Sequence, residues 1–399
     1  MAQLSDDCFA FDGKPLPLEE AQARLKDLAP QLRGEDWVPL ADLAGRILSR
    51  DLVSARSVPP FLNSAVDGYA YAHGQGAPIS LRQHVPAGSP LPPPLALGEA
   101  ARVLTGAPLP PGTDTVVMDE DAQLEGQLLT VPAALKPGSN ARPKGEDLAE
   151  GQTLYPAGHG VSALDIGRIA AGGLDGAWVH RPLRLHILSS GDEIRSGQIA
   201  DANRWLLSAV FPAPAFDLSF GGVVADTPEA SHAALQGIEA DLILTSGGVS
   251  VGERDYLRDA IEALGSLAFW KVGIKPGRPV AFGQIGETPI FGLPGNPVAC
   301  FITAQFLAYP FALTMLGAEA KPATFPVTLA RDYKKKAGRT EFVRVHVEAD
   351  GTARPYGVAG AGVISSLTQT DGLVVLGHDL TQVPAGSKVP FLPFKGLVA

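Results

Sequence analysis

The segment 240–255, ADLILTSGGVSVGERD, constrains the fold of this chain more than any other. Its residues 242–244 form a short, continuously apolar run, which is typical of a parallel strand buried on both faces. Glycines and serines follow, and residues 253–264 then have the apolar spacing of a helix. We therefore predict a strand, a tight turn and a helix in succession.

The turn Ser246-Gly247-Gly248 is a candidate anion site. Glycine lets the backbone turn tightly and approach a ligand, and the N-terminus of the following helix would add unpaired N–H groups and a positive dipole end. An ordinary strand-to-helix connection would use the same residue types. This stretch alone leaves both interpretations open.

Composition limits the protein classes that need consideration. A chain of 399 residues predicts two to four domains, and its net charge of −10 disfavours nucleic acid and acidic membranes as partners. Cys8 and Cys300 are too few for a disulfide framework, and the scattered histidines do not suggest zinc. The N-terminal residues suggest neither a signal peptide nor a membrane span, so we expect a cytoplasmic protein.

The first half of the chain predicts helices and then a small β domain. Apolar spacing predicts amphipathic helices over 17–29 and over 39–48, followed by an extended, proline-limited crossing at 54–60. A helix with Ser162 as its N-cap is expected over 162–171. The β domain is indicated by strand-like runs at 79–85, 101–105, 115–118 and 128–131.

Strands alternate with helices from about 182 to 317, which predicts a doubly wound parallel sheet. Ligands of such sheets collect at the carboxyl ends of the strands, where the turns 189–193 and 246–248 are expected. A long apolar helix should begin at Asn296-Pro297 and kink at Pro310.

The last part of the chain has the texture of a C-terminal β domain. Lys334-Lys335-Lys336 is expected at a solvated hairpin tip within it. Strands are predicted at 324–330, 341–347, 362–367, 373–376 and 389–394.

Several polar residues stand out in this acidic chain. Lys271, Lys275 and Arg278 gather among glycines and prolines, which favours an anion site over a basic surface patch. Asp67 and Thr105 lie in glycine turns, where they could contact a ligand or serve only as turn residues. The charged loop around Arg142 could hold an oxyanion beside a carboxylate, or could be ordinary solvated surface.

Seven motifs occur in one order along the chain: NSAVDGYA, TGAPLPPG, GEDLAEG, SSGDE, TSGGVSVGERDY, FWKVGIKPGRP and GLPGNPV. Together they resemble the MoeA family, the molybdopterin molybdenumtransferases related to the E domain of gephyrin. The resemblance extends from about residue 16 to residue 394. Seven motifs in order are far more specific than any one of them.

The resemblance implies a multidomain fold of the α/β plus β class. Its parts would be a helical linker domain (14–56 and 143–181), a small N-terminal β domain (57–142), a doubly wound parallel-sheet, MogA-like domain (182–320) and a C-terminal β-barrel-like domain (321–399). It further implies a homodimer whose active site is shared between the doubly wound domain of one subunit and the small β domain of the other.

The implied activity is insertion of molybdate into adenylylated molybdopterin with release of AMP, the final step of molybdenum cofactor biosynthesis, assisted by Mg2+. Matching the motifs position by position implies catalytic roles for Asp67, Thr105, Arg142, Asp147, Glu193, Asp255, Lys271 and Lys275. Implied substrate contacts are Ser190, Gly191, Ser246, Gly247, Gly248, Ser250, Arg278, Pro294, Pro297 and Ser365 or Ser366. Candidate Mg2+ ligands are Asp192, Glu193, Asp226 and Asp255.

Other interpretations share these motifs. A tungstate-inserting homologue, a gephyrin-like scaffold or another pterin-binding protein remain alternatives. The molybdopterin adenylyltransferase and molybdoenzyme chaperones are candidate partners, whereas nucleic acid and membranes are not expected. The chain departs from the family at residues 201–207, DANRWLL, where the family commonly has Asp-Ser-Asn. The loss of the serine hydroxyl and the gain of a tryptophan put a local pocket contact in doubt.

Overall fold

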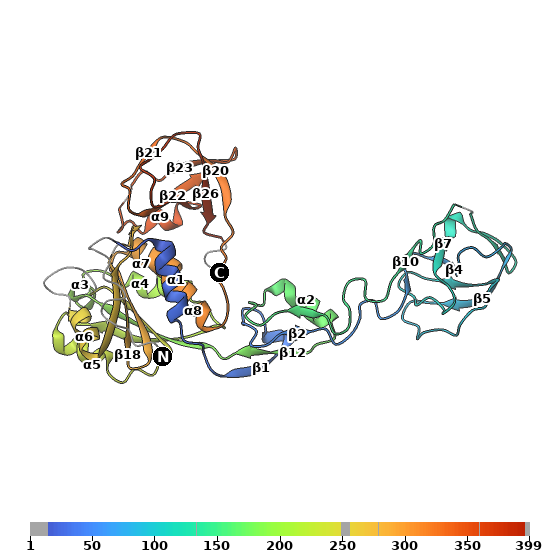
Figure 1. Ribbon diagram of the computed structural model, residues 1–399, viewed down its shortest axis with the longest axis horizontal. Helices are drawn as coiled ribbons and strands as arrows, with labels where there is room; N and C mark the ends of the chain where they lie inside the picture. The colour runs from blue at the N-terminus through green and yellow to red at the C-terminus, as the bar shows by residue number, and fades with distance from the viewer. Residues whose placement is uncertain (1–14, 133, 249–255, 278, 359, 396–399) are drawn as a thin grey trace. The chain divides into compact units, whose positions relative to one another are not determined.

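The structure is a computed structural model that describes residues 15–132, 134–248, 256–277, 279–358 and 360–395 (Figure 1). The chain divides into two compact units. The first unit comprises residues 1–36, 45–49 and 179–399, and the second comprises residues 37–44 and 50–178. The limits of the four predicted domains remain a prediction.

A six-stranded sheet with the order β14-β13-β15-β19-β18-β16 forms the centre of the first unit. The first four strands are parallel, whereas β18 and β16 are antiparallel to their neighbours. The predicted parallel sheet is thus confirmed for four strands, and a hairpin of β18 and β19 adds an antiparallel edge. The strand bounds are β13 Leu183–Ser190, β14 Phe216–Val224, β15 Leu242–Ser246, β16 Gly265–Lys271, β18 Pro279–Ile285 and β19 Thr288–Leu293.

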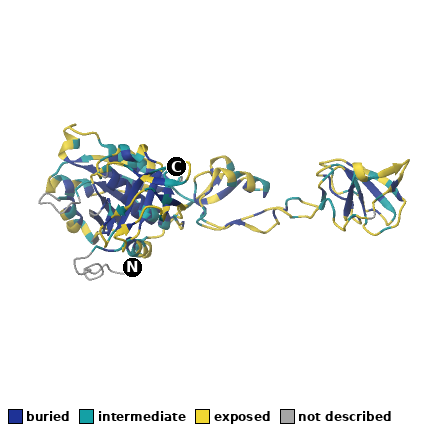
Figure 2. Ribbon diagram, turned by 90° about the horizontal axis from the view of Figure 1, so that it is seen from above, coloured by how far each residue is buried: buried dark blue, intermediate teal, exposed yellow. Residues whose placement is uncertain are grey.

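Helices cover both faces of this sheet, and Figure 2 shows its strands as buried. On β15, Leu242 and Leu244 belong to one core and Ile243 to the other, because successive side chains of a strand point to opposite faces. This explains the continuous apolar run in the sequence. One face packs against α1 Leu18–Leu28, α4 Ala202–Val210, α7 Pro297–Thr303 and α8 Tyr309–Met315, and the other against α5 Pro228–Leu235 and α6 Tyr256–Leu264.

The predicted long apolar helix is interrupted before Pro310 and not at it. A π-helical turn, Ala304–Ala308, separates α7 from α8, and Pro310 is the second residue of α8. Pro310 has no N–H, so the carbonyl of Phe306 is free to accept a bond from Gln22 Nε2 at 2.9 Å. The stretch Pro297–Met315 is long and apolar enough to cross a membrane, yet 83% of its most apolar window is buried, as in a core helix.

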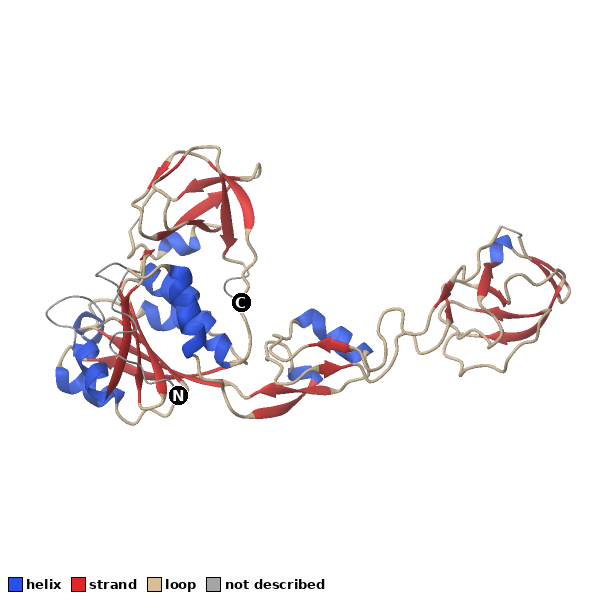
Figure 3. Cartoon of the chain, viewed as in Figure 1, coloured by secondary structure: helices blue, strands red, loops and turns tan. Residues whose placement is uncertain are grey.

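The C-terminal strands form a sheet that closes on itself (Figure 3). Its order is β17-β22-β23-β20-β26-β24, and a further pairing of β22 with β24 completes a barrel. The predicted barrel-like domain is confirmed. The bounds are β17 Ile274–Lys275, β20 Phe325–Leu329, β22 Thr340–Val347, β23 Thr352–Pro355, β24 Gly372–Leu376 and β26 Lys388–Pro393, with the pair β21 Tyr333–Lys334 and β25 Gln382–Val383 beside it.

The strand predicted at 362–367 is wrong, because a short helix, α9 Ser365–Thr368, lies there. The Ser366 hydroxyl donates to the Val363 carbonyl, and the Thr370 hydroxyl donates to the Ser366 carbonyl. Such side-chain bonds to nearby carbonyls favour a helical turn over an extended strand.

The second unit contains a six-stranded sheet in the order β7-β4-β6-β5-β9-β8. It confirms the small β domain expected from the strand-like runs, although β6 begins two residues before the predicted run. The bounds are β4 Gly68–Tyr71, β5 Ile79–Val85, β6 Glu99–Val103, β7 Thr115–Met118, β8 Gln123–Glu125 and β9 Leu128–Thr130.

Short paired strands and one helix complete the description. Helix α2, Ala163–Ala171, has the predicted N-cap, with Ser162 and Asp165 forming a capping box. The helix predicted over 39–48 is wrong: only a 3-10 turn, Leu40–Asp42, forms, and Gly45 has a φ of +82°, which ends helical geometry. The pairs are β1 Glu35–Pro39 with β12 Gly176–His180, β2 Leu52–Val53 with β11 Thr153–Tyr155, and β3 Asn63–Ser64 with β10 Ala141–Arg142.

The sequence predicts Lys335 at a solvated hairpin tip, and for this residue the prediction is wrong. The residue is only 8% exposed, and its ammonium group donates to the carbonyls of Gly377, His378 and Leu380 at 2.8, 3.3 and 2.8 Å. Its long side chain therefore ties β21 to the turn after β24. Lys334 and Lys336 are exposed, as predicted.

We expect Lys335→Met to lower the free energy of unfolding by about 2–3 kcal/mol, because three carbonyls lose a charged donor in a buried place. Lys336→Met is the matched control, and its exposed position predicts a change below about 0.5 kcal/mol. Urea unfolding of both full-length variants checks this. Equal midpoints for the two variants would contradict the structural role of Lys335.

Candidate functional site

Polar side chains gather where β13, β14, β15 and β19 end. We call Ser189, Ser190, Asp201, Asn203, Asp226 and Ser246 the strand-edge cluster. Ser189 Oγ donates to Asp201 Oδ2 at 2.6 Å, and Asn203 Nδ2 donates to both Ser246 Oγ and the Gly295 carbonyl at 2.7 Å. The helices after β13 and β15 pack on opposite faces of the sheet, which makes this edge the expected ligand crevice of a doubly wound fold.

The turn after β15 depends on its glycines. Gly247 and Gly248 have φ values of +90° and +69°, and a Cβ on Gly247 would lie 2.7 Å from the Ser190 carbonyl oxygen. Any other residue at Gly247 would therefore strain the backbone and push against β13. The predicted turn is confirmed at Gly247 and Gly248, whereas its remaining residues 249–252, which include Ser250, and Asp255 lie outside the described residues.

Three of the predicted Mg2+ ligands lie near this edge. Asp226 accepts from Ser190 Oγ at 3.0 Å and from the Asp192 N–H at 3.2 Å, so β14 and the start of α3, Asp192–Arg195, are held together. Glu193 follows Asp192, and both side chains are exposed. Within the described ranges, no three His, Cys, Asp or Glu side chains converge on one point as a ready-made metal site.

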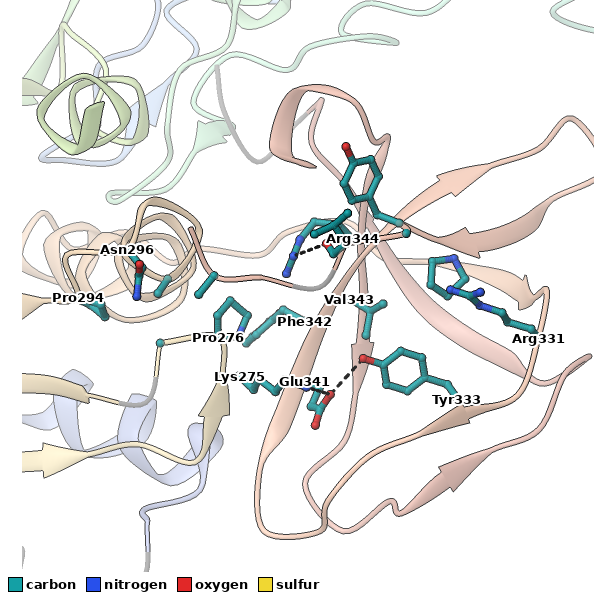
Figure 4. Close-up of a pocket in the computed structure, with 17 residues that line it drawn as sticks. Lys275, Pro276, Pro294, Asn296, Arg331, Tyr333, Glu341, Phe342, Val343 and Arg344 are labelled. Carbon is teal, nitrogen blue, oxygen red and sulfur yellow. Dashed lines mark hydrogen bonds and ion pairs between the residues drawn. The ribbon is translucent and has the colours of Figure 1, made fainter. Parts of the chain in front are cut away.

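A pocket, which we call the barrel pocket, lies between the central sheet's loops and the C-terminal barrel (Figure 4). It has a volume of about 400 Å³. The segments that connect strands of the central sheet contribute Lys275 of β17, and Pro294 and Asn296 after β19. Most of the remaining lining comes from the barrel and the loop after β23: Arg331, Tyr333, Glu341, Phe342, Val343, Arg344, Pro355, Tyr356, Gly357, Val358 and Ala361.

Arg344 is the most buried cation of this pocket, at 6% exposure. Its Nε donates to Ser366 Oγ at 3.1 Å, and its Nη2 donates to the Gly360 carbonyl at 3.1 Å. Burial lowers the pKa of Arg344, but the ordinary guanidinium value is so high that the group stays charged at neutral pH. Ser366, one of the two candidate serines, thus stands behind Arg344 and is fully buried.

The loop 294–296 connects the two places. Its Gly295 carbonyl accepts the bond from Asn203, while its neighbours Pro294 and Asn296 line the barrel pocket. Pro297 then begins α7. Lys271 is exposed at the end of β16, and Arg278 lies outside the described residues.

Sequence analysis missed Arg331, Arg344, Tyr333 and Glu341. A signal for two of them was present, because Glu341 and Arg344 are charged residues inside a strand that is otherwise mostly apolar. Such charges are buried only when they are paired or hydrogen-bonded. Nothing in the sequence could indicate that the barrel carries them to the loop 294–296.

The remaining candidates lie in the second unit. Thr105 donates to Asp67 Oδ1 through its N–H at 2.6 Å and its hydroxyl at 2.8 Å, so the two predicted residues are neighbours. These bonds, led by the backbone N–H, lower the pKa of Asp67 and keep it ionised at neutral pH. Arg142 pairs with Glu146 at 2.6 Å, and Asp147 is exposed beside them.

The departure at 201–207 leaves the strand-edge cluster intact. Asp201 caps α4 by accepting from the Arg204 N–H at 3.1 Å, and Asn203 makes the bonds described above. Trp205 is 66% exposed, with the Arg204 guanidinium 5.0 Å from its ring centre. The tryptophan therefore points away from the cluster, on the opposite side of α4 from Asn203.

We expect Gly247→Ala to destabilise the protein by roughly 3 kcal/mol, because it combines a disfavoured φ with a backbone overlap. Gly222→Ala is the matched control: Gly222 has a φ of +80° but open space around its Cβ position. Its cost should be about 1–2 kcal/mol, from the backbone conformation alone. Calorimetric unfolding measures the stability of both variants. Equal losses of stability would show that the close approach of Gly247 to Ser190 adds no cost.

Three family models match the chain. The MoeA N-terminal region (domains I and II) matches residues 16–173, a probable molybdopterin binding domain matches residues 186–314, and the MoeA C-terminal region (domain IV) matches residues 326–394. A molybdopterin molybdenumtransferase from Haemophilus influenzae is 32% identical over 96% of this chain and 100% of its own length. One from Nostoc is 32% identical, with 91% and 90% covered.

Solved structures agree with these matches. The molybdopterin biosynthesis MoeA protein from Pyrococcus horikoshii superimposes with a TM-score of 0.80 at 27% identity, covering 96% of this chain and all of its own. The family models cover most of the chain, and the relative from Haemophilus influenzae is 32% identical over nearly all of it. The multidomain fold is shared as well. The chain therefore belongs to the MoeA family.

Proposed function

We propose that this protein is a molybdopterin molybdenumtransferase, which inserts molybdate into adenylylated molybdopterin and releases AMP in the final step of molybdenum cofactor biosynthesis. The observation that carries the proposal is the match over 96% of the chain to a relative with this activity in its name. The strand-edge cluster and the barrel pocket supply chemistry that suits its two substrates.

The strand-edge cluster suits the phosphate part of the pterin substrate. The left-handed turn at Gly247 and Gly248 brings backbone close to Ser190 at the end of β13. Backbone N–H groups and hydroxyls at the carboxyl edge of a parallel sheet are suitable donors for phosphate oxygens. We assign Ser190, Gly191, Ser246, Gly247 and Gly248 to substrate binding.

The barrel pocket suits a tetrahedral dianion. Lys275, Arg331 and Arg344 bring three positive charges to its lining, and Glu341 brings one negative charge. The lining therefore has a net charge of +2, which is equal and opposite to the charge of molybdate. Arginine and lysine donate charge-assisted hydrogen bonds to oxyanions, and the nearby loop 294–296 would place such an anion next to the pterin.

Mg2+ fits the strand edge only as a partly substrate-held ion. Asp192, Glu193 and Asp226 offer the carboxylate oxygens that Mg2+ prefers, but they do not form a closed cage. One or two of these carboxylates would hold the ion together with phosphate oxygens of the substrate. When bound, Mg2+ would offset charge on the phosphoanhydride and on departing AMP. The chain's own residues would hold the two substrates in the orientation that the reaction needs.

We further propose a cytoplasmic homodimer in which Asp67, Thr105, Arg142 and Asp147 of the second unit reach the active site of the partner subunit. Asp67 and Thr105 are exposed polar residues, and they form a hydrogen bond to each other within one subunit. This supports a role toward a ligand rather than a role inside the fold. The adenylyltransferase that makes the pterin substrate would be a natural partner.

The direct test is incubation of the purified protein with adenylylated molybdopterin, Mg2+ and molybdate. We expect AMP and metal-bound pterin to appear together, and chelation of Mg2+ to slow both. Tungstate in place of molybdate tests the closest alternative, since the two anions are alike in size and charge. Pterin binding without AMP release would instead favour a gephyrin-like scaffold.

Subunit mixing tests the shared site. We expect Asp67→Ala and Lys275→Ala each to be inactive alone, because each would remove one part of every site. Mixed after mild dissociation, the two variants should recover about a quarter of the wild-type rate, since half of the dimers would be mixed and hold one intact site of two. No recovery despite mixed dimers, or a monomer by light scattering, would contradict this proposal.

A further inference from the structure

Glu341 is a buried carboxylate for which the assignments above give no role beyond its charge. Its side chain is only 2% exposed, in β22 at the wall of the barrel pocket. A buried charge is costly unless it is paired and hydrogen-bonded, and an apolar residue would be the ordinary choice for a barrel strand. Its position therefore calls for a physical explanation.

Both carboxylate oxygens are occupied. Arg339 donates to Oε1 from Nε at 2.9 Å and contacts it from Nη2 at 2.8 Å. Tyr333 and Lys275 each donate to Oε2 at 3.2 Å. Burial, followed by the charge of Glu341, raises the pKa of Tyr333 to about 12, so its hydroxyl remains a donor at neutral pH.

Lys275 differs from the other partners because it comes from β17, which lies in the chain between β16 and β18 of the central sheet. β17 pairs with β22 in parallel, and this register places Lys275 opposite Glu341. The Lys275 side chain is 43% exposed. Figure 4 shows Glu341 between Lys275 and Tyr333. An ammonium group has three N–H donors, so one can serve Glu341 while two remain for an anion in the pocket.

We propose that Glu341 is a positioning residue: it holds the Lys275 ammonium at the pocket wall for the incoming oxyanion, and Arg339 and Tyr333 hold Glu341. The inference rests on the proposed function and deepens it by naming what orders the anion site. A free lysine side chain loses rotamer freedom when it binds a ligand, and prior pairing removes much of that loss.

The negative charge of Glu341 would by itself repel an incoming anion. Arg339 pairs with Oε1 of the carboxylate and offsets that charge. The effect of Glu341 on the oxyanion therefore acts through the position of Lys275.

The test uses the full-length protein and sodium molybdate alone, measured by titration calorimetry, together with the kinetics of AMP release. For Glu341→Gln we expect molybdate binding about tenfold weaker, and a KM for molybdate about tenfold higher, with kcat nearly unchanged. Tyr333→Phe removes only one donor to the carboxylate and should weaken binding about threefold. Glu348→Gln, in an exposed pair with Arg354 on the same barrel, is the matched control and should change neither value.

A double-mutant cycle separates positioning from a purely structural role. In the Lys275→Gln background, Glu341→Gln should have almost no further effect on molybdate binding, because its effect acts through Lys275. Additive losses, or unchanged binding in Glu341→Gln, would overturn the inference. If Glu341→Gln does not fold, the same cycle with Tyr333→Phe decides the question by the same criteria.

The outcomes also separate this inference from the proposed function. Molybdate binding that depends on Glu341, without AMP release by the wild type, would support the positioning role and remove the transferase proposal. AMP release with molybdate binding that ignores Glu341 would do the reverse. A wild type that does not bind molybdate alone would overturn the positioning role.

Discussion

Parallel strands impose the constraint on which the site depends. β13, β14, β15 and β19 run in one direction, so the polar residues after each strand arrive at the same edge. The apolar residues of these strands are buried in cores on both faces, and the helices leave for opposite faces at this edge. As a geometric consequence, hydroxyls, carboxylates and backbone N–H groups lie together at this edge.

The two-residue strand β17 extends this arrangement to the barrel. Its pairing with β22 places Lys275 opposite Glu341, and the loop 294–296 is shared between the strand-edge cluster and the barrel pocket. The cations of the barrel pocket and the proposed phosphate site thus become neighbours. This juxtaposition suits a reaction that joins an oxyanion to a phosphorylated pterin, because positioning two reactants is itself a large part of catalysis.

Much of the fold could be predicted from local patterns. The alternation of strands and helices, the N-cap at Ser162 and the glycine turn at 246–248 were confirmed, since each depends on residues close in sequence. The helix over 39–48 was wrong because Gly45 takes a left-handed conformation. The strand at 362–367 was wrong because side-chain hydroxyls bond nearby carbonyls.

The sequence by itself determined the family resemblance, the classes of its parts and the candidate residues, because motif order and hydrophobic periodicity are properties of the chain alone. Only the tertiary structure decided that Lys335 is buried among three carbonyls, that Lys275 bonds Glu341 and that Arg344 lines the same pocket. These contacts join residues dozens of positions apart. Barrel closure and strand register set them, and no local pattern encodes either.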